Sequence, residues 1–137
     1  MEAKAKILIL DDEPIVGERL KATLERAGFS VDTFSSSQKA LERLHSERYD
    51  ILVTDLKMSG PDGMFVLKEA KQLHPDIKAV VITGFATAST AEKALESGAV
   101  MFIAKPFKMS QLKSVLLDLS KGETNSDEQT KNSTDEI

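Results

Sequence analysis

Short apolar runs, each followed by a stretch with helical periodicity, repeat five times along the chain. The run Ile51-Leu52-Val53 is short and rich in β-branched side chains, which is typical of a strand buried on both faces. After the first run, Val16, Leu20 and Leu24 are spaced so that they share one face of a helix. The expected strands lie at residues 6–10, 29–34, 50–55, 79–82 and 99–104. The pattern therefore predicts strands and helices in strict alternation.

Residues with strong positional preferences mark the ends of the predicted helices. Pro14 suits the first turn of the first helix, and Gly28 ends that helix. Asp62 is placed to cap the third helix, which we expect over residues 63–73. The core face of this helix is assigned to Phe65, Val66, Leu67 and Ala70. The other helices are expected over residues 38–45, from Thr87 or Ser89 to Gly98, and over residues 109–119.

The connections between the predicted elements decide the fold class. Strict alternation with short connections indicates an α/β fold whose five-stranded parallel sheet is covered by helices on both faces. Residues 29–34 alternate apolar and polar side chains, which places this second strand at an edge. We therefore expect a doubly wound, flavodoxin-like three-layer sandwich with strand order 2-1-3-4-5. Its switch point would bring together Asp11, Asp12 and Asp55, which follow or end the first and third strands.

The composition narrows the functional classes. At 137 residues, with 41% hydrophobic and 29% charged residues, the chain fits one ordinary globular domain. The net charge of −4 and the lack of a basic stripe argue against direct nucleic-acid binding. The chain has no cysteine, so chemistry based on thiolates or disulfides is excluded.

Both ends of the chain are polar. Residues 1–6 are too polar for a secretory signal, and no apolar run approaches the roughly 18 residues that cross a bilayer, so we expect a cytoplasmic protein without membrane contact. Residues 121–136 contain no apolar side chain, and such a segment buries too little surface to offset the entropy of ordering it. We therefore expect one domain over residues 1–120 and a disordered tail over residues 121–137.

Four strand ends carry polar side chains of complementary chemistry. Asp11, Asp12 and Asp55 would repel one another unless a divalent cation lies among them, and Mg²⁺ prefers such oxygen ligands and usually pairs with a phosphate. A phosphoryl group on Asp55 would carry charge on three terminal oxygens. The metal ion, Lys105 and Thr83 would supply one partner for each oxygen. Taken alone, each residue has a simpler interpretation as a helix-favouring carboxylate, a turn hydroxyl or a solvated lysine.

The same strand ends lie within motifs that follow one another in a fixed order. The motifs are Ile7-Leu8-Ile9-Leu10-Asp11-Asp12-Glu13-Pro14, Asp55-Leu56-Lys57-Met58 followed by Asp62-Gly63, Thr83-Gly84, and Gly98-Ala99 followed by Phe102 and Lys105-Pro106-Phe107. In order and spacing they resemble the receiver domain of two-component response regulators, over about residues 5–120. One departure is Ser59, which stands where the family often has proline after Met58, although no ligand is lost.

The resemblance implies a phosphoacceptor site. Asp55 would accept a phosphoryl group from the phosphohistidine of a sensor histidine kinase or a histidine phosphotransfer protein. Mg²⁺, or Mn²⁺ in its place, would bind directly to Asp12, Asp55 and the backbone carbonyl of Lys57. Asp11 would act mainly through a metal-bound water.

The resemblance also implies a switch. Thr83 would move toward the phosphoryl group, and Phe102 would turn inward into the vacated space. The peptide bond between Lys105 and Pro106 would be cis and would hold the lysine toward the site. The altered face, within residues 87–119, would bind a downstream protein, the chain's own output domain if the chain is a piece of a longer protein, or a second copy in a phosphorylation-dependent homodimer.

Three functional classes are weighed against one another. The leading one is a phosphorylation-switched regulator that is not a conventional enzyme, although slow self-hydrolysis of its phosphoryl group would follow. A phosphatase or mutase of the haloacid dehalogenase type is disfavoured, because it needs a cap region and a second aspartate two residues after its nucleophile, whereas Asp12 follows Asp11 directly. A receiver-like dimerisation scaffold would not need the complete acidic cluster.

His45 and His74 are interpreted as solvated residues.

Overall fold

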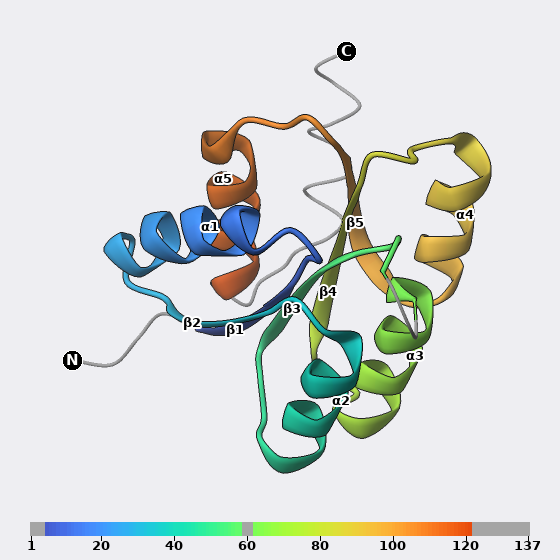
Figure 1. Ribbon diagram of the computed structural model, residues 1–137, viewed down its shortest axis with the longest axis horizontal. Coiled ribbons are helices and arrows are strands. Elements are labelled where there is room, and N and C mark those ends of the chain that lie inside the picture. The colour runs from blue at the N-terminus through green and yellow to red at the C-terminus, as the bar shows by residue number, and fades with distance from the viewer. Residues whose placement is uncertain (1–4, 59–61, 122–137) are drawn as a thin grey trace.

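The computed structural model of the protein describes residues 5–58 and 62–121, in which strands and helices alternate without exception (Figure 1). The strands are β1 (Lys6–Leu10), β2 (Ser30–Phe34), β3 (Ile51–Asp55), β4 (Lys78–Thr83) and β5 (Ala99–Ala104). The helices are α1 (Pro14–Arg26), α2 (Ser37–Ser46), α3 (Gly63–Leu73), α4 (Ala88–Glu96) and α5 (Met109–Ser120). The predicted tail from residue 122 onward and the departure at Ser59 lie outside the described residues.

All neighbouring strands are parallel, and their order is β2-β1-β3-β4-β5. Figure 1 shows α1 and α5 on one side of the sheet and α2, α3 and α4 on the other. This arrangement confirms the predicted three-layer α/β fold and the edge position of β2. Every residue of β3 is buried, as expected for the strand at the centre of the sheet.

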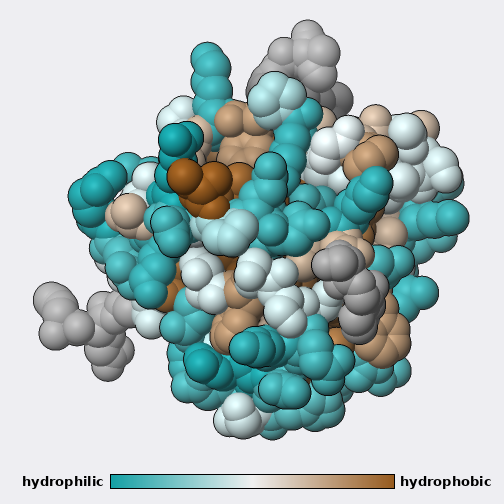
Figure 2. All heavy atoms as spheres, viewed as in Figure 1, coloured by the Kyte–Doolittle hydropathy of each residue, from teal (hydrophilic) through white to brown (hydrophobic). Residues whose placement is uncertain are grey.

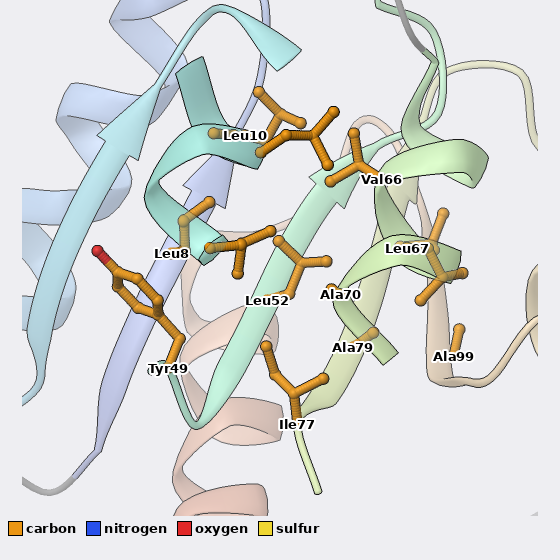
Figure 3. Close-up of a cluster of buried hydrophobic side chains, with 14 of the residues drawn as sticks. Leu8, Leu10, Tyr49, Leu52, Val66, Leu67, Ala70, Ile77, Ala79 and Ala99 are labelled. Carbon is orange, nitrogen blue, oxygen red and sulfur yellow. The ribbon is translucent and has the colours of Figure 1, made fainter. Parts of the chain in front are cut away.

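The alternation of side chains along each strand divides the core into two clusters. Leu8 and Leu52 point to one face of the sheet, where they pack with Val66 and Leu67 of α3 (Figure 3). The opposite face packs against α1 and α5 through residues that include Ile7, Ile9, Val53, Leu20, Leu24, Leu112 and Leu116. Fully burying one such side chain stabilises the fold by about 1.5–3 kcal/mol before conformational entropy is counted. The two clusters hold the strand ends, and therefore the site, in fixed register.

The ends of the helices follow the predicted signals. The side chains of Ser36 and Asp62 accept hydrogen bonds from backbone N–H groups of α2 and α3. Thr87, rather than Ser89, caps α4 and forms a reciprocal capping box. Gly28 follows α1 with φ of 104°, a left-handed conformation that favours glycine at this position.

Two expectations for single side chains were wrong. Phe65 does not lie on the core face of α3 but is 48% exposed, because that face is filled by Val66 and Leu67 on the neighbouring positions of the turn. His74 is not simply solvated, since it is half-buried and its Nε2 lies 2.8 Å from the carbonyl oxygen of Leu44. This contact ties the end of α3 to α2.

Candidate functional site

Parallel strands bring the charged residues of the sequence motifs to one edge of the sheet. Leu10, the last residue of β1, pairs in register with Thr54, so that Asp11 follows β1 next to Asp55 at the end of β3. Asp11 and Asp55 are 1% and 6% exposed, whereas Asp12 faces solvent. Carboxylates are rarely this buried unless they have partners.

The principal partner of both buried carboxylates is Lys105, which follows β5. Its Nζ lies 2.8 Å from Asp11 Oδ2 and 2.9 Å from Asp55 Oδ2. Burial acts to lower the pKa of Lys105, but the hydrogen bonds that its ammonium donates to Asp11 and Asp55 outweigh burial, so the pKa stands above its ordinary value. The ammonium therefore remains charged between the two acids. The peptide bond between Lys105 and Pro106 is cis, as the resemblance implied.

Backbone amides fix the second oxygen of each buried carboxylate. The N–H of Glu13 donates to Asp11 Oδ1 at 2.9 Å, and the N–H of Lys57 donates to Asp55 Oδ1 at 3.2 Å. In both cases the donor is two residues after the aspartate, which is the geometry of an Asx turn. Each carboxylate is thus oriented between a lysine ammonium and its own chain before any ligand arrives.

The acidic cluster has the ligand atoms of a site for a hard metal ion. One carboxylate oxygen from each of Asp11, Asp12 and Asp55 lies within 4.8 Å of the other two. Only oxygens are offered, which suits Mg²⁺, Mn²⁺ or Ca²⁺ better than a thiophilic metal. Asp12 lies on the solvent side, so the cluster is open to an incoming ion. These residues therefore fit a divalent cation, which would share the carboxylates with Lys105.

Thr83 ends β4, and Phe102 lies on β5 before Lys105. The fully buried Thr83 ends β4 next to β3, and its hydroxyl accepts a hydrogen bond from the N–H of Phe85 at 3.0 Å. Within residues 5–58 and 62–121, no hydrogen bond joins this hydroxyl to Asp55. Phe102 is half-buried on β5 and packs against the core cluster that contains Val81. Their movement on phosphorylation stays a prediction.

Sequence reasoning missed two contacts next to the site. The ammonium of Lys57 lies 4.3 Å from the ring centroid of Phe85, so a cation–π contact joins the loops that follow β3 and β4. Gly63 donates its N–H to the carbonyl of Leu56 at 2.9 Å and packs directly against the backbone of Asp55. Glycine in a turn-rich segment signals a tight approach, but the sequence does not show which atoms approach.

Separate apolar positions are exposed on the surface of α4 and β5. Figure 2 shows a mostly hydrophilic face interrupted by small hydrophobic patches. Among large apolar residues, Leu95 of α4 is 51% exposed, and Val100 and Met101 of β5 are 47% and 37% exposed. None of the helices that the structure describes is both long enough and apolar enough to span a bilayer.

Comparison with known proteins places this site in a family. The family model of the response regulator receiver domain matches residues 7–117. The C4-dicarboxylate transport transcriptional regulatory protein DctD of Rhizobium meliloti (strain 1021) is 34% identical over 112 residues, which are 82% of this chain. The same match covers 24% of DctD, so this chain spans about a quarter of that relative.

Solved structures agree with the sequence comparison. A response regulator protein from Burkholderia pseudomallei, crystallised with a phosphorylated aspartic acid, calcium ion and citrate, has a TM-score of 0.81 at 27% identity, over 96% of this chain and 74% of that one. The beryllofluoride-activated NtrC4 receiver domain dimer has a TM-score of 0.77 at 30% identity, over 84% of this chain and 94% of that one. With its five parallel strands, its buried aspartates and these matches, the chain belongs to the response regulator receiver domain family.

Proposed function

We propose that this chain is a phosphorylation switch in which Asp55 accepts a phosphoryl group from a sensor histidine kinase or a histidine phosphotransfer protein. The observation that carries the proposal is the ammonium of Lys105, which lies 2.9 Å from Asp55 and 2.8 Å from Asp11 within a buried acidic cluster. A cation at this position neutralises negative charge next to the carboxylate that ends the fully buried strand β3 at the sheet edge. Residues 1–120 would form this regulatory unit.

The chemistry follows from what surrounds Asp55. An oxygen of its carboxylate attacks phosphorus while the bond from phosphorus to the donor's imidazole nitrogen breaks, and the imidazole leaves. The ammonium of Lys105, which is 2.9 Å from Asp55 Oδ2, would pair with an oxygen of the incoming group, and the Lys57 N–H holds Asp55 Oδ1 in place. A bound Mg²⁺ or Mn²⁺ would neutralise charge on the phosphoryl oxygens. Its ligands would be Asp12, Asp55 and the Lys57 carbonyl, with Asp11 acting through water.

A structural response would follow from the position of Thr83. Its hydroxyl accepts a hydrogen bond from Phe85, so its own proton is free to be donated to a phosphoryl oxygen. Movement of Thr83 toward Asp55 would alter the packing of Phe102, which pairs in register with Val81 on the neighbouring strand. We propose that this change reaches α4, β5 and α5.

The surface of α4 and β5 is the proposed output face. Leu95, Val100 and Met101 expose apolar area there, and the similar NtrC4 receiver domain is a dimer when activated by beryllofluoride. A second copy, a downstream protein or an output domain in the same polypeptide would bind this face. The proposed role is regulatory rather than enzymatic. The proposed location is the cytoplasm, and in this proposal the receiver itself does not bind nucleic acid.

Mass spectrometry tests the transfer. After incubation with acetyl phosphate and Mg²⁺, the wild-type chain should gain one phosphoryl group, and Asp55→Asn should gain none. Phosphorylation of Asp55→Asn at the wild-type level would reject Asp55 as the acceptor.

Chemical shifts measured with beryllofluoride, a phosphoryl mimic, test the response. We expect changes from residues 55–59 through 83–90 to 100–108, with α2 nearly unaffected. Changes confined to the surroundings of Asp55, with one rotamer of Phe102 throughout, would favour an unswitched scaffold instead.

A further inference from the structure

Gly63, the first residue of α3, leaves no room for a side chain. A Cβ atom at this position would lie 1.9 Å from the carbonyl oxygen of Asp55, 2.8 Å from its carbonyl carbon and 2.8 Å from the Cα of Leu56. All three are backbone atoms of the proposed phosphoacceptor segment, so no side-chain rotation can relieve the overlap. Gly63 does not have the positive φ that would require glycine for conformational reasons. Close packing alone therefore demands glycine here.

Two hydrogen bonds hold the carbonyl groups of the same backbone segment. The N–H of Gly63 donates to the carbonyl of Leu56 at 2.9 Å. The buried hydroxyl of Thr54 donates to the carbonyl of Asp55, also at 2.9 Å. Asp62 caps α3 by accepting a hydrogen bond from the N–H of Phe65 at 2.9 Å, which fixes the first turn of the helix. The peptide between Asp55 and Leu56 is thus held between β3 and the capped first turn of α3.

We propose that Gly63 is a positioning residue for phosphoryl transfer. Because it packs against the backbone of Asp55 and Leu56, it sets the direction of the Asp55 carboxylate and the Lys57 carbonyl. This inference rests on the proposed role of Asp55 as phosphoacceptor. The carboxylate is attached to the backbone that Gly63 contacts, and its Oδ1 is bound by the N–H of Lys57 in the same loop. A shift of this peptide therefore moves the attacking oxygen and the proposed metal ligands together. Displacements of about 1 Å at reacting groups cost up to about 100-fold in rate.

Gly63→Ala tests the proposal, and Gly84→Ala is the matched control. Gly84 follows Thr83 at the same sheet edge, and nothing lies within 4 Å of a Cβ atom built there. We expect Gly63→Ala to be phosphorylated by acetyl phosphate about 100-fold more slowly than wild type and to bind Mg²⁺ about tenfold more weakly. Gly84→Ala should stay within about twofold of wild type in both measurements.

A readout without phosphorylation separates positioning from stability. In samples shown to be folded by urea unfolding curves, the backbone amide shifts of residues 54–57 should change in Gly63→Ala before any donor is added. The inference is overturned if the folded variant shows wild-type shifts at these amides and wild-type Mg²⁺ affinity. If wild type itself is not phosphorylated, the proposed function fails. The amide shifts and the Mg²⁺ titration still test whether Gly63 positions the Asp55 segment.

A second variant decides the matter if Gly63→Ala does not fold. Thr54→Val removes the hydroxyl that donates to the Asp55 carbonyl while keeping a side chain of the same shape in the core. It should shift the same amides and slow phosphorylation several-fold. Wild-type rates and unshifted amides in Thr54→Val would overturn the inference.

Discussion

Two clusters of charged side chains, similar in geometry, differ in burial and therefore in what they can do. The site cluster consists of Lys105, Asp11 and Asp55, and the edge cluster, where α2 meets β2, consists of Arg43, Asp32, Glu47 and Tyr49. Their ion pairs span 2.8–2.9 Å and 3.3 Å, respectively. The carboxylate side chains are 0% and 8% exposed in the site cluster, but 36% and 40% exposed in the edge cluster.

We attribute the proposed chemical role of the site cluster to its burial. Solvated pairs such as those of the edge cluster gain little from each other, because water screens their charges and the side chains lose entropy when they pair. In the site cluster, each charge depends on its partners, because water cannot replace them. A transferred phosphoryl group there would meet a positive charge that is poorly screened.

The largest expected contrast concerns phosphorylation. Asp55→Asn should abolish it, whereas Asp32→Asn, which changes a carboxylate of the edge cluster, should leave the rate near the wild-type value. Radiolabelled or mass-detected phosphorylation over time measures both. A comparable loss of phosphorylation in both variants would mean that the two clusters are not distinct in function.

Removal of the central cation should produce the next largest effect. Lys105→Met keeps the length of the side chain but leaves Asp11 and Asp55 without their shared ammonium, which should lower the free energy of unfolding by about 3 kcal/mol. Mg²⁺ should restore part of the loss, because a cation bound to the folded state adds stability by mass action. Urea unfolding with and without chelator measures this. An equal loss in both conditions would argue against a metal site at these carboxylates.

High pH should weaken both clusters through groups whose pKa is raised. The pKa of Tyr49 is raised by burial and by the hydrogen bond to Asp32, and that of Lys105 is raised by its two carboxylates despite burial. A group with a raised pKa stabilises the folded state fully below its unfolded pKa, and this contribution is lost as pH rises toward the folded pKa. Stability should therefore fall above about pH 10, the ordinary pKa of tyrosine.

Tyr49→Phe isolates the contribution of the edge cluster to this decline. Without an ionisable hydroxyl, the variant should lose stability less steeply between about pH 10 and pH 12. Urea midpoints across this range provide the measurement. An unchanged slope would show that the Tyr49 hydroxyl does not contribute to the alkaline transition.

The smallest effect should come from Arg43→Met. Its pairs with Asp32 and Glu47 are more than one-third exposed, so water screens their charges, and their loss should cost little stability and should not change phosphorylation. Thermal or urea unfolding, combined with the phosphorylation assay, would check both parts. A loss as large as that of Lys105→Met would remove the distinction between the clusters.

The sequence predicted the site at the level of strand ends. Asp11, Asp55 and Lys105 each follow or end a strand, and parallel strands in the order 2-1-3-4-5 place such positions at one edge. The order itself followed from the edge-like alternation in residues 29–34 and from strict β/α alternation. Periodicity and topology therefore sufficed to bring these three residues together.

The pattern of hydrophobic and polar residues did not predict contacts between particular atoms. Periodicity assigned Phe65 to the core face of α3, although the side chain is largely exposed. The boundary of a buried helix face depends on which elements pack against the helix, and periodicity alone does not show this. It also gave no sign of the contact of Gly63 with Asp55, or of the hydrogen bond from Tyr49 to Asp32, because these depend on how elements distant in sequence approach one another. Such details are set by three-dimensional packing.

The position of Lys105 has a consequence for local opening of the molecule. Its side chain binds the ends of β1 and β3, and its N–H donates to the carbonyl of Thr83 at the end of β4, so that one residue joins four strand ends. Any local unfolding that separates β5 and α5 from the rest of the sheet must break all of these bonds together. The amide of Lys105 should therefore exchange its hydrogen with solvent only in rare, cooperative openings. Phosphorylation of Asp55, by recruiting the ammonium, would change how often they occur.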